Sequence, residues 1–258
     1  MRLTNENYFS KEAGLYYMGS SQFKAFKNCE ASALAEVKGE LIKPASDALL
    51  IGSYVDAYFS GEFNEFTESH PDIYTKAGEL KAKYKAAEAC IARAERDPVF
   101  MSYISGEMQP IETGEIEGVP VKIKIDALHA DKIVDLKCMR DIKPVKTETG
   151  LKTFIDYYGY DIQAYMYQII HEQNTGQKLP FYFAVITKET SPDLEIIHLP
   201  QWRINQAGEV VRHYIKRFDL IKKGEIVPER CGRCAYCKAT KRLKAPIEYE
   251  DLYDRYHA

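Results

Sequence analysis

The sequence predicts an α/β or α+β fold in which a small mixed sheet is flanked by helices. Residues 20–97 carry apolar side chains at helical spacing, whereas residues 108–137 alternate apolar and polar side chains as strands do. Another helical pattern, two β-rich runs and a last helical pattern follow. We expect one domain over residues 1–258, with a helical part at 1–105, a core at 106–200 and a helix with a cysteine-rich tail at 201–258.

Five segments have the apolar spacing of amphipathic helices, and four have the composition of strands. Glycines at the ends of two helical segments, Gly61 and Gly176, are expected to terminate them. The expected helices cover residues 21–38, 46–61, 74–97, 153–176 and 204–224. The expected strands lie within residues 115–128, 132–137, 179–189 and 194–200, and the first two form an antiparallel meander with a turn at Gly118.

Charge and hydropathy exclude some classes of protein. The net charge of −3 and the pI near 6.1 give no overall attraction to nucleic acid, so a polyanion would have to meet a local basic surface. No apolar run is long enough to span a membrane, and residues 1–14 lack the apolar stretch of a signal peptide. We therefore expect a cytoplasmic protein whose six cysteines stay reduced and serve as metal ligands or packing residues.

Two aspartates and a lysine interrupt the apolar pattern of a predicted hairpin. If residues 129–132 form its turn, positions whose numbers sum to 261 face each other, and Asp126 lies opposite Asp135. Asp135 and Lys137 are two residues apart, so they share one face of the strand. The sequence therefore predicts a cluster of two carboxylates and one ammonium group on a sheet.

Such a cluster has a chemical use and an ordinary alternative. Facing side chains have Cβ atoms about 5 Å apart, where two carboxylates repel each other unless a cation lies between them. Mg²⁺ prefers oxygen ligands, and a nearby lysine can act on a water molecule or on developing negative charge. The alternative is a hairpin whose charges simply face solvent, and this motif alone does not decide between the two.

Three further side chains could complete a site. Gln163 and Tyr167 are one helical turn apart and share a face of the predicted helix 153–176. Asp56 stands on the predicted helix 46–61, which could bring a further carboxylate to the metal. Taken alone, Gln163 and Tyr167 fit an ordinary half-buried amphipathic helix equally well.

Together these residues resemble the PD-(D/E)XK nucleases of the RecB-like group, which have a restriction-endonuclease-like core. The order Asp126-x8-Asp135-Leu136-Lys137, followed by Gln163-x3-Tyr167, carries the resemblance. Residues 52–63 are similar to the family helix that carries a metal-binding histidine, with Asp56 in its place. Residues 20–33 are similar to the family's opening segment, in which proline usually stands where this chain has Glu30. The resemblance is greatest to RecE-like exonucleases of phages and prophages and spans residues 19–240.

The resemblance implies a DNA exonuclease that uses Mg²⁺ or Mn²⁺ and acts on double-stranded ends in phage-type homologous recombination. Asp56, Asp126, Asp135 and the Leu136 carbonyl would hold the metal, and Lys137 would act on the water and the transition state. Gln163 and Tyr167 would orient the site or the DNA backbone.

The same resemblance implies a homo-oligomeric ring around DNA, a single-strand annealing protein as partner, and a phage- or prophage-encoded chain in a bacterial cell. Two alternatives remain. One is a metal-stapled DNA-binding or scaffold module whose carboxylates are structural, and the other is a processing nuclease of the CRISPR-adaptation type.

The tail carries a second metal motif. Cys231, Cys234 and Cys237 are each separated by two residues, and successive C-x2-C steps bring thiolates onto one ion or cluster. Resemblance to AddB-type nucleases implies Cys29 as the fourth ligand of a 4Fe–4S iron-sulfur cluster. Zinc is the alternative, because four thiolates also suit it.

Two basic stretches could meet a DNA backbone. Arg140 and Lys143 follow Lys137 closely, while Lys238 and Arg242 lie in the cysteine-rich tail. Side chains of this kind bind phosphate oxygens without reading sequence, so we predict DNA contacts at these four positions.

Overall fold

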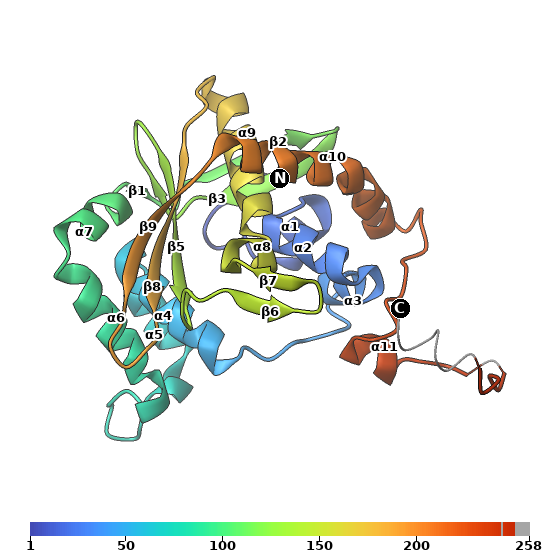
Figure 1. Ribbon diagram of the computed structural model, residues 1–258, viewed down its shortest axis with the longest axis horizontal. Helices are drawn as coiled ribbons and strands as arrows, with labels where there is room; N and C mark the ends of the chain where they lie inside the picture. The colour runs from blue at the N-terminus through green and yellow to red at the C-terminus, as the bar shows by residue number, and fades with distance from the viewer. Residues whose placement is uncertain (244, 251–258) are drawn as a thin grey trace.

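The computed structural model describes residues 1–243 and 245–250, so the end of the predicted tail lies outside the described part. Its centre is a five-stranded mixed sheet with the strand order β1-β4-β5-β8-β9 (Figure 1). Strands β5 and β8 run parallel, and the other neighbours are antiparallel. The strands are β1 (Glu107–Met108), β4 (Ala127–Leu128), β5 (Ile133–Met139), β8 (Phe181–Thr187) and β9 (Leu194–Leu199).

The parallel pair follows from the helical crossover between its strands. Helices α8 (Phe154–Tyr158) and α9 (Tyr160–Thr175) carry the chain from the end of β5 back to the start of β8. Strand β8 is apolar on both faces, as expected for a strand covered by helices on both sides. Its Phe183 packs on the α9 side, whereas Ala184 packs against the opposite layer.

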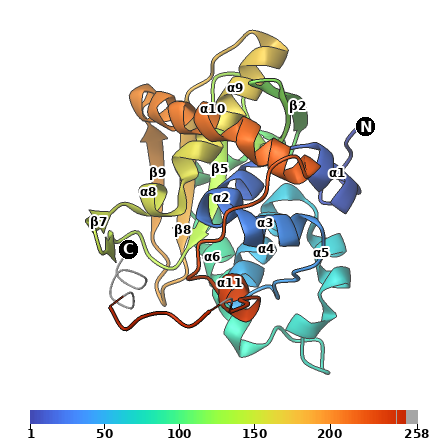
Figure 2. The ribbon, with the colours of Figure 1, turned by 90° about the vertical axis from the view of Figure 1, so that its right-hand side faces the viewer.

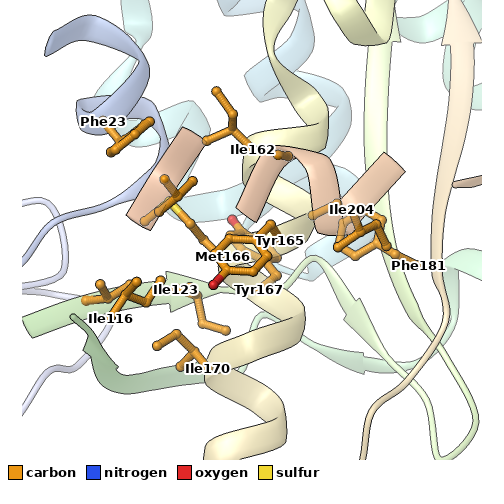
Figure 3. Close-up of a cluster of buried hydrophobic side chains, with 14 of the residues drawn as sticks. Phe23, Ile116, Ile123, Ile162, Tyr165, Met166, Tyr167, Ile170, Phe181 and Ile204 are labelled. Atoms are coloured by element: carbon orange, nitrogen blue, oxygen red, sulfur yellow. The ribbon is translucent and has the colours of Figure 1, made fainter. Parts of the chain in front are cut away.

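One face of the sheet is covered by α9 and by elements from both ends of the chain. A hairpin of two strands joins this layer, and Figure 3 shows the apolar side chains that fill the space between α9, the hairpin and β8. The elements are α2 (Ser20–Asn28), α3 (Glu30–Val37), β2 (Ile111–Ile116), β3 (Val119–Lys124) and α10 (Gln201–Lys223).

The opposite face packs against a second layer of helices, which Figure 2 shows on the far side of the strands from α9 and α10. The buried side chains of this layer meet Val134 of β5 and Ala184 of β8. Its helices are α4 (Asp47–Ser60), α5 (Phe63–Ser69), α6 (Lys85–Glu95) and α7 (Pro98–Ile104). The fold class predicted from the sequence, a small mixed sheet flanked by helices, is confirmed.

The sequence pattern does not predict several short elements as separate units. They are too short to show a periodic signal, because a helix needs about two turns before its apolar spacing repeats. They are α1 (Lys11–Tyr16), the 3-10 turns η1 (Pro71–Ile73) and η2 (Ala82–Tyr84), β6 (Val145–Thr147), β7 (Gly150–Lys152) and α11 (Ala235–Ala239).

Three predicted helices differ from the observed ones. The segment 21–38 is two helices, because Cys29 adopts an extended conformation between α2 and α3. In the segment 74–97 a turn at Gly78 precedes α6, which begins only at Lys85. The segment 153–176 is divided at Gly159, whose left-handed conformation separates α8 from α9. The predicted ends at Gly61 and Gly176 are confirmed.

The predicted hairpin register is confirmed, but the meander is only partly right. Ala127 pairs with Val134 and Leu128 with Ile133, so facing positions sum to 261. Strand β3 pairs with β2 around the predicted turn at Gly118, but it does not continue into the partner of β5. The chain bends at Asp126, between β3 and β4, so Asp126 lies outside the β2–β3 and β4–β5 ladders.

Among the described residues, no helix combines the length and the apolar composition that crossing a membrane requires.

Candidate active site

Asp135 is the centre of the acidic cluster and is fully buried on β5. Its side chain points toward α9, where the Gln163 amide donates a hydrogen bond to its Oδ1. The Lys137 ammonium, two residues along the same face, forms an ion pair with its Oδ2. This Oδ2 receives no well-directed hydrogen bond from the described residues, so Lys137 supports it mainly by charge.

Asp126 enters the same space from the bend between β3 and β4. Its Oδ2 accepts a hydrogen bond of 2.8 Å from the backbone N–H of Leu136, which fixes the carboxylate beside the next strand. Burial raises the pKa of Asp126 well above its usual value, and the negative charges of Asp135 and Asp56 raise it further. The two predicted carboxylates therefore do lie close together and repel each other.

Asp56 brings the third carboxylate from α4. Burial and the charge of Asp135 raise the pKa of Asp56 to about 6, although Lys137 and Lys124 oppose the shift. Its Oδ2 accepts a hydrogen bond of 3.2 Å from the amide of Gln109, a residue that the sequence did not single out.

Lys137 remains charged in this surrounding. Burial alone would lower its pKa, but the carboxylates of Asp135 and Asp126 raise it above the ordinary lysine value. The Nζ atom also lies 4.7 Å from the centroid of the Tyr160 ring, where a cation is attracted to the aromatic face.

Two of the three carboxylates border a cavity of about 630 Å³. Asp56 and Asp126 line it together with Tyr167, which lies one turn beyond Gln163 on α9. Tyr167 is labelled in Figure 3, where it projects from the same helix as Met166 and Ile170. We call Asp56, Asp126, Asp135 and Lys137 the acidic site.

A second group, which we call the thiol site, joins the α2–α3 junction to the tail. Among the described residues, it is the one set of three or more metal-ligating side chains whose ligand atoms all lie within 4.8 Å of one another. The distances between sulfur atoms are 3.5 Å from Cys29 to Cys237, 3.8 Å from Cys29 to Cys234 and 4.0 Å from Cys231 to Cys237.

Hydrogen bonds favour a thiolate at Cys231, whereas burial raises the pKa of Cys237 to about 12. Burial alone would raise the pKa of Cys231, but backbone N–H groups of Cys234 and Arg233 and the neighbouring thiols lower it to about 6. The extended conformation of Cys29, which breaks the predicted long helix, places its sulfur among the tail cysteines.

An ion-pair network fastens the tail next to the thiol site. Glu30, where the resembling family has proline, accepts two hydrogen bonds from Arg217 at 2.7 and 2.9 Å. It also accepts one from the backbone N–H of Glu229 at 2.7 Å. This departure from the family pattern therefore has a structural reason, because the carboxylate ties α3, α10 and the tail together.

The comparisons with known proteins agree with this geometry. A family model described as a PDDEXK-like domain of unknown function (DUF3799) matches residues 19–240. The chain belongs to this PDDEXK-like family. The crystal structure of a "putative exonuclease" from Eubacterium rectale is similar, with 44% sequence identity, 98% of each chain covered and a TM-score of 0.92. Among curated proteins, none matches the chain.

The donor atoms of the PDDEXK-like acidic site suit a hard divalent cation. Three carboxylates supply only oxygen, although their atoms are not gathered as closely as those of the thiol site. Burial and neighbouring negative charge raise the pKa values of Asp56 and Asp126, and Asp135 Oδ2 is buried with only an ion-pair partner. A cation among them would relieve the repulsion. The role of the Leu136 carbonyl as a ligand stays a prediction.

The four basic residues predicted to bind DNA stay predictions as well. Arg140 is exposed and pairs with Asp141 at 2.7 Å, and Lys143, Lys238 and Arg242 are also exposed. Their exposure leaves them available to a polyanion.

Sequence reasoning missed Gln109 and Lys24, which both approach the acidic site. Gln109 reaches Asp56 by a side-chain contact across 53 positions, and no local pattern encodes such a contact. Its positive φ of 53° is unusual for a residue other than glycine, but a sequence does not show it.

Proposed function

We propose that this PDDEXK-like protein is a metal-dependent deoxyribonuclease of the RecB-like group, most similar to RecE-like enzymes, that degrades duplex DNA from its ends. The observation that carries the proposal is the convergence of Asp126, from the bend before β4, with Asp135 and Lys137, which share one face of β5, next to a cavity that Asp126 lines. The similarity to a protein described as an exonuclease supports the same reaction class.

The side chains of the acidic site would have different roles in the reaction. Bound Mg²⁺ or Mn²⁺ would supply positive charge to the scissile phosphate and acidify a water molecule. Asp56, Asp126 and Asp135 would hold that ion. Lys137, kept charged by its carboxylate neighbours, would donate a hydrogen bond to the attacking water or to the phosphate oxygen that gains negative charge.

Residues of α9 would orient the acidic site. Gln163 occupies Oδ1 of Asp135 and so leaves Oδ2 on the side of Lys137. Tyr167 lines the cavity, and burial raises the pKa of its hydroxyl well above its usual value, so it would act as a neutral donor toward DNA or water.

The experiment that tests the activity uses end-labelled linear duplex and a closed circle of the same sequence, each with Mg²⁺ or Mn²⁺. We expect degradation of the linear DNA alone, with Asp135→Asn and Lys137→Ala each losing roughly 10³-fold or more in rate. Asp131→Asn, at an exposed position of the hairpin turn, is the matched control and should keep the wild-type rate. Metal-dependent cleavage by pure Asp135→Asn would contradict the proposal.

A DNA-binding scaffold is the second candidate, and the charges argue against it. A scaffold gains nothing from three neighbouring carboxylates, two with raised pKa values, because their repulsion opposes folding. The scaffold would bind DNA without cleaving it. A processing nuclease of the CRISPR-adaptation type would instead trim a defined overhang and stop, which the same labelled substrate would reveal.

The role in phage-type recombination, the ring and the single-strand annealing partner rest on the resemblance alone. Light scattering of the full chain with and without linear duplex tests the ring. Co-purification with a co-expressed annealing protein tests the partner, and a monomer that binds neither would refute both.

For the thiol site we propose one tetrahedral metal ion, with zinc as the metal. A zinc ion with four Zn–S bonds of about 2.3 Å separates its sulfur atoms by roughly 3.8 Å, and the three sulfur distances given above bracket that value. The iron-sulfur alternative spaces its cysteines more widely, because each thiolate binds a different iron. Colourless protein with one zinc per chain is the expected result. Brown protein purified without oxygen, with iron and sulfide, would establish the cluster instead.

A further inference from the structure

A second lysine approaches the acidic site from α2. The Nζ atom of Lys24 lies 4.9 Å from the centroid of the Tyr160 ring, and Lys137 Nζ lies 4.7 Å from the same centroid. The ammonium groups of Lys24 and Lys137 therefore both contact the Tyr160 ring, and that of Lys137 also pairs with Asp135.

The backbone makes room for this second lysine. A Cβ atom at Gly159 would lie 3.3 Å from Lys24 Cδ, which is tighter than ordinary contact, and the φ of +62° at Gly159 also disfavours a side chain. The glycine that separates α8 from α9 therefore leaves space for the aliphatic part of the Lys24 side chain, whose ammonium group lies beside Tyr160.

Lys24 lacks the counter-charge that Lys137 has. Among the described residues, no carboxylate lies within ion-pair distance of Lys24, and the nearby Asp161 is paired with Arg203 at 3.0 Å. Burial and the positive charge of Lys137 lower the pKa of Lys24 to about 8, although the more distant charges of Asp135 and Asp161 oppose the shift. A nearby anion stabilises the charged form of a half-buried ammonium group that has no other paired carboxylate.

An exposed aromatic surface continues from the same ring. Tyr158, at the end of α8, stacks on Tyr160 with centroids 5.6 Å apart and ring planes 29° from parallel. Almost half of the Tyr158 side chain remains exposed, so it can receive a further flat group. Bases stack on such rings without regard to sequence.

We propose that Lys24 and Tyr158 form a nucleotide subsite beside the acidic site, where Lys24 binds a phosphate flanking the scissile one and Tyr158 stacks a base of the same strand. The inference rests on the proposed nuclease function and adds the residues that position the cleaved strand. The Lys24 ammonium and the exposed Tyr158 ring both contact Tyr160. Their adjacent positions match the alternation of phosphate and base along a single strand.

The test measures binding of a fluorescein-labelled single-stranded oligonucleotide to the full chain in EDTA, by anisotropy at several salt concentrations. We expect Lys24→Met to raise Kd about tenfold and to reduce the slope of log K against log salt by about one. Lys27→Met is the matched control, because Lys27 lies on the same helix over the Tyr214 ring but is exposed. It should stay within twofold of the wild type.

The aromatic half of the subsite has its own pair of variants. Tyr158→Ala should raise Kd about fivefold to tenfold, whereas the neighbouring and equally exposed Tyr157→Ala should have a smaller effect. Lys24→Arg should restore most of the binding, because it retains the charge. Melting temperatures of all variants separate loss of binding from loss of fold.

The outcomes distinguish the subsite from the function. If the wild type binds and cleaves DNA while Lys24→Met and Tyr158→Ala retain wild-type Kd values, the proposed subsite is wrong and the proposed nuclease function is supported. If the wild type neither binds nor cleaves DNA, both the proposed function and the proposed subsite are wrong.

Discussion

The acidic site and the thiol site differ in what holds them in place. The acidic site is built on β5, α4 and the bend before β4, all parts of the main core, and it contains its own cation in Lys137. The thiol site joins one buried junction to the tail after α10, and in the described part of that tail the five-residue α11 is the one regular element.

Because the two sites are held in place differently, metal binding is expected to have a different effect at each. The acidic site can form without a metal, because the sheet places its carboxylates and Lys137 offsets part of their charge. Among the described residues, the apolar burial of the tail at the thiol site is a small cluster around Cys29, Ala31 and Cys237, too little to hold the tail without metal or ion pairs. We therefore expect metal to support chemistry at the first site and folding at the second.

The two hairpin aspartates also differ from each other. From the sequence, each would destabilise the metal-free fold equally by repulsion. In the structure, Asp135 forms an ion pair with Lys137, whereas Asp126 has no ion-pair partner among the described residues and burial raises its pKa. Asp126 is therefore the carboxylate that lacks a directly paired cation, a distinction that the sequence did not provide.

The largest effect expected on stability follows from that distinction. In chelator, Asp135→Asn should lower the free energy of unfolding by about 3 kcal/mol, because it leaves the Lys137 ammonium buried without its partner. Asp126→Asn should be neutral or stabilising, since its side-chain oxygen can still accept from Leu136 N–H. Urea denaturation of both variants checks the pair, and equal losses would show that the two aspartates are equivalent after all.

The second effect concerns the thiol site. Cys234→Ser should lower the melting temperature by about 5–10 °C and release the metal, because the tail then loses its attachment to Cys29. Cys90→Ser is the control for losing a buried thiol elsewhere, since Cys90 lies in α6 and binds the Thr187 carbonyl. Scanning calorimetry with metal analysis measures both. An unchanged melting temperature in metal-free Cys234→Ser would mean that the tail folds without the ion.

The third effect tests how much the tail depends on ion pairs rather than on metal. Glu30→Gln should cost about 1–2 kcal/mol, because it weakens the charged hydrogen bonds from Arg217 and the Glu229 backbone. Glu209→Gln, in an exposed pair with Arg212, should cost almost nothing. If both changes have the same small effect in urea titrations, the network beside the thiol site is only a surface feature.

The smallest effect is a pH dependence. Because the folded pKa of Asp56, about 6, lies above its ordinary value of 3.8, the folded state binds this proton more tightly than the unfolded state. Its stabilising effect is therefore complete below about pH 4 and is lost as pH rises to about 6. In chelator, the wild type should lose stability relative to Asp56→Asn between pH 4 and pH 7. Saturating Mg²⁺ should reduce that loss at pH 7, and parallel pH curves without metal would exclude Asp56 as the titrating group.

The sequence by itself determined those features that depend on local periodicity. The hairpin register follows from the turn at residues 129–132, and the alternation of side chains then places Asp135 and Lys137 on one face. Helical spacing likewise puts Gln163 and Tyr167 on one side of α9. Glycines mark helix ends because they adopt the left-handed conformation without a steric penalty.

Only the tertiary structure decided which distant residues meet and how their charges balance. The contact from Gln109 to Asp56, the seat of Lys24 on Gly159 and the break at Cys29 depend on how separate elements pack. Burial, which raises the pKa of Asp126, is likewise a property of the assembled core. Local patterns therefore specified the faces of single elements, whereas long-range packing set the environment in which their side chains act.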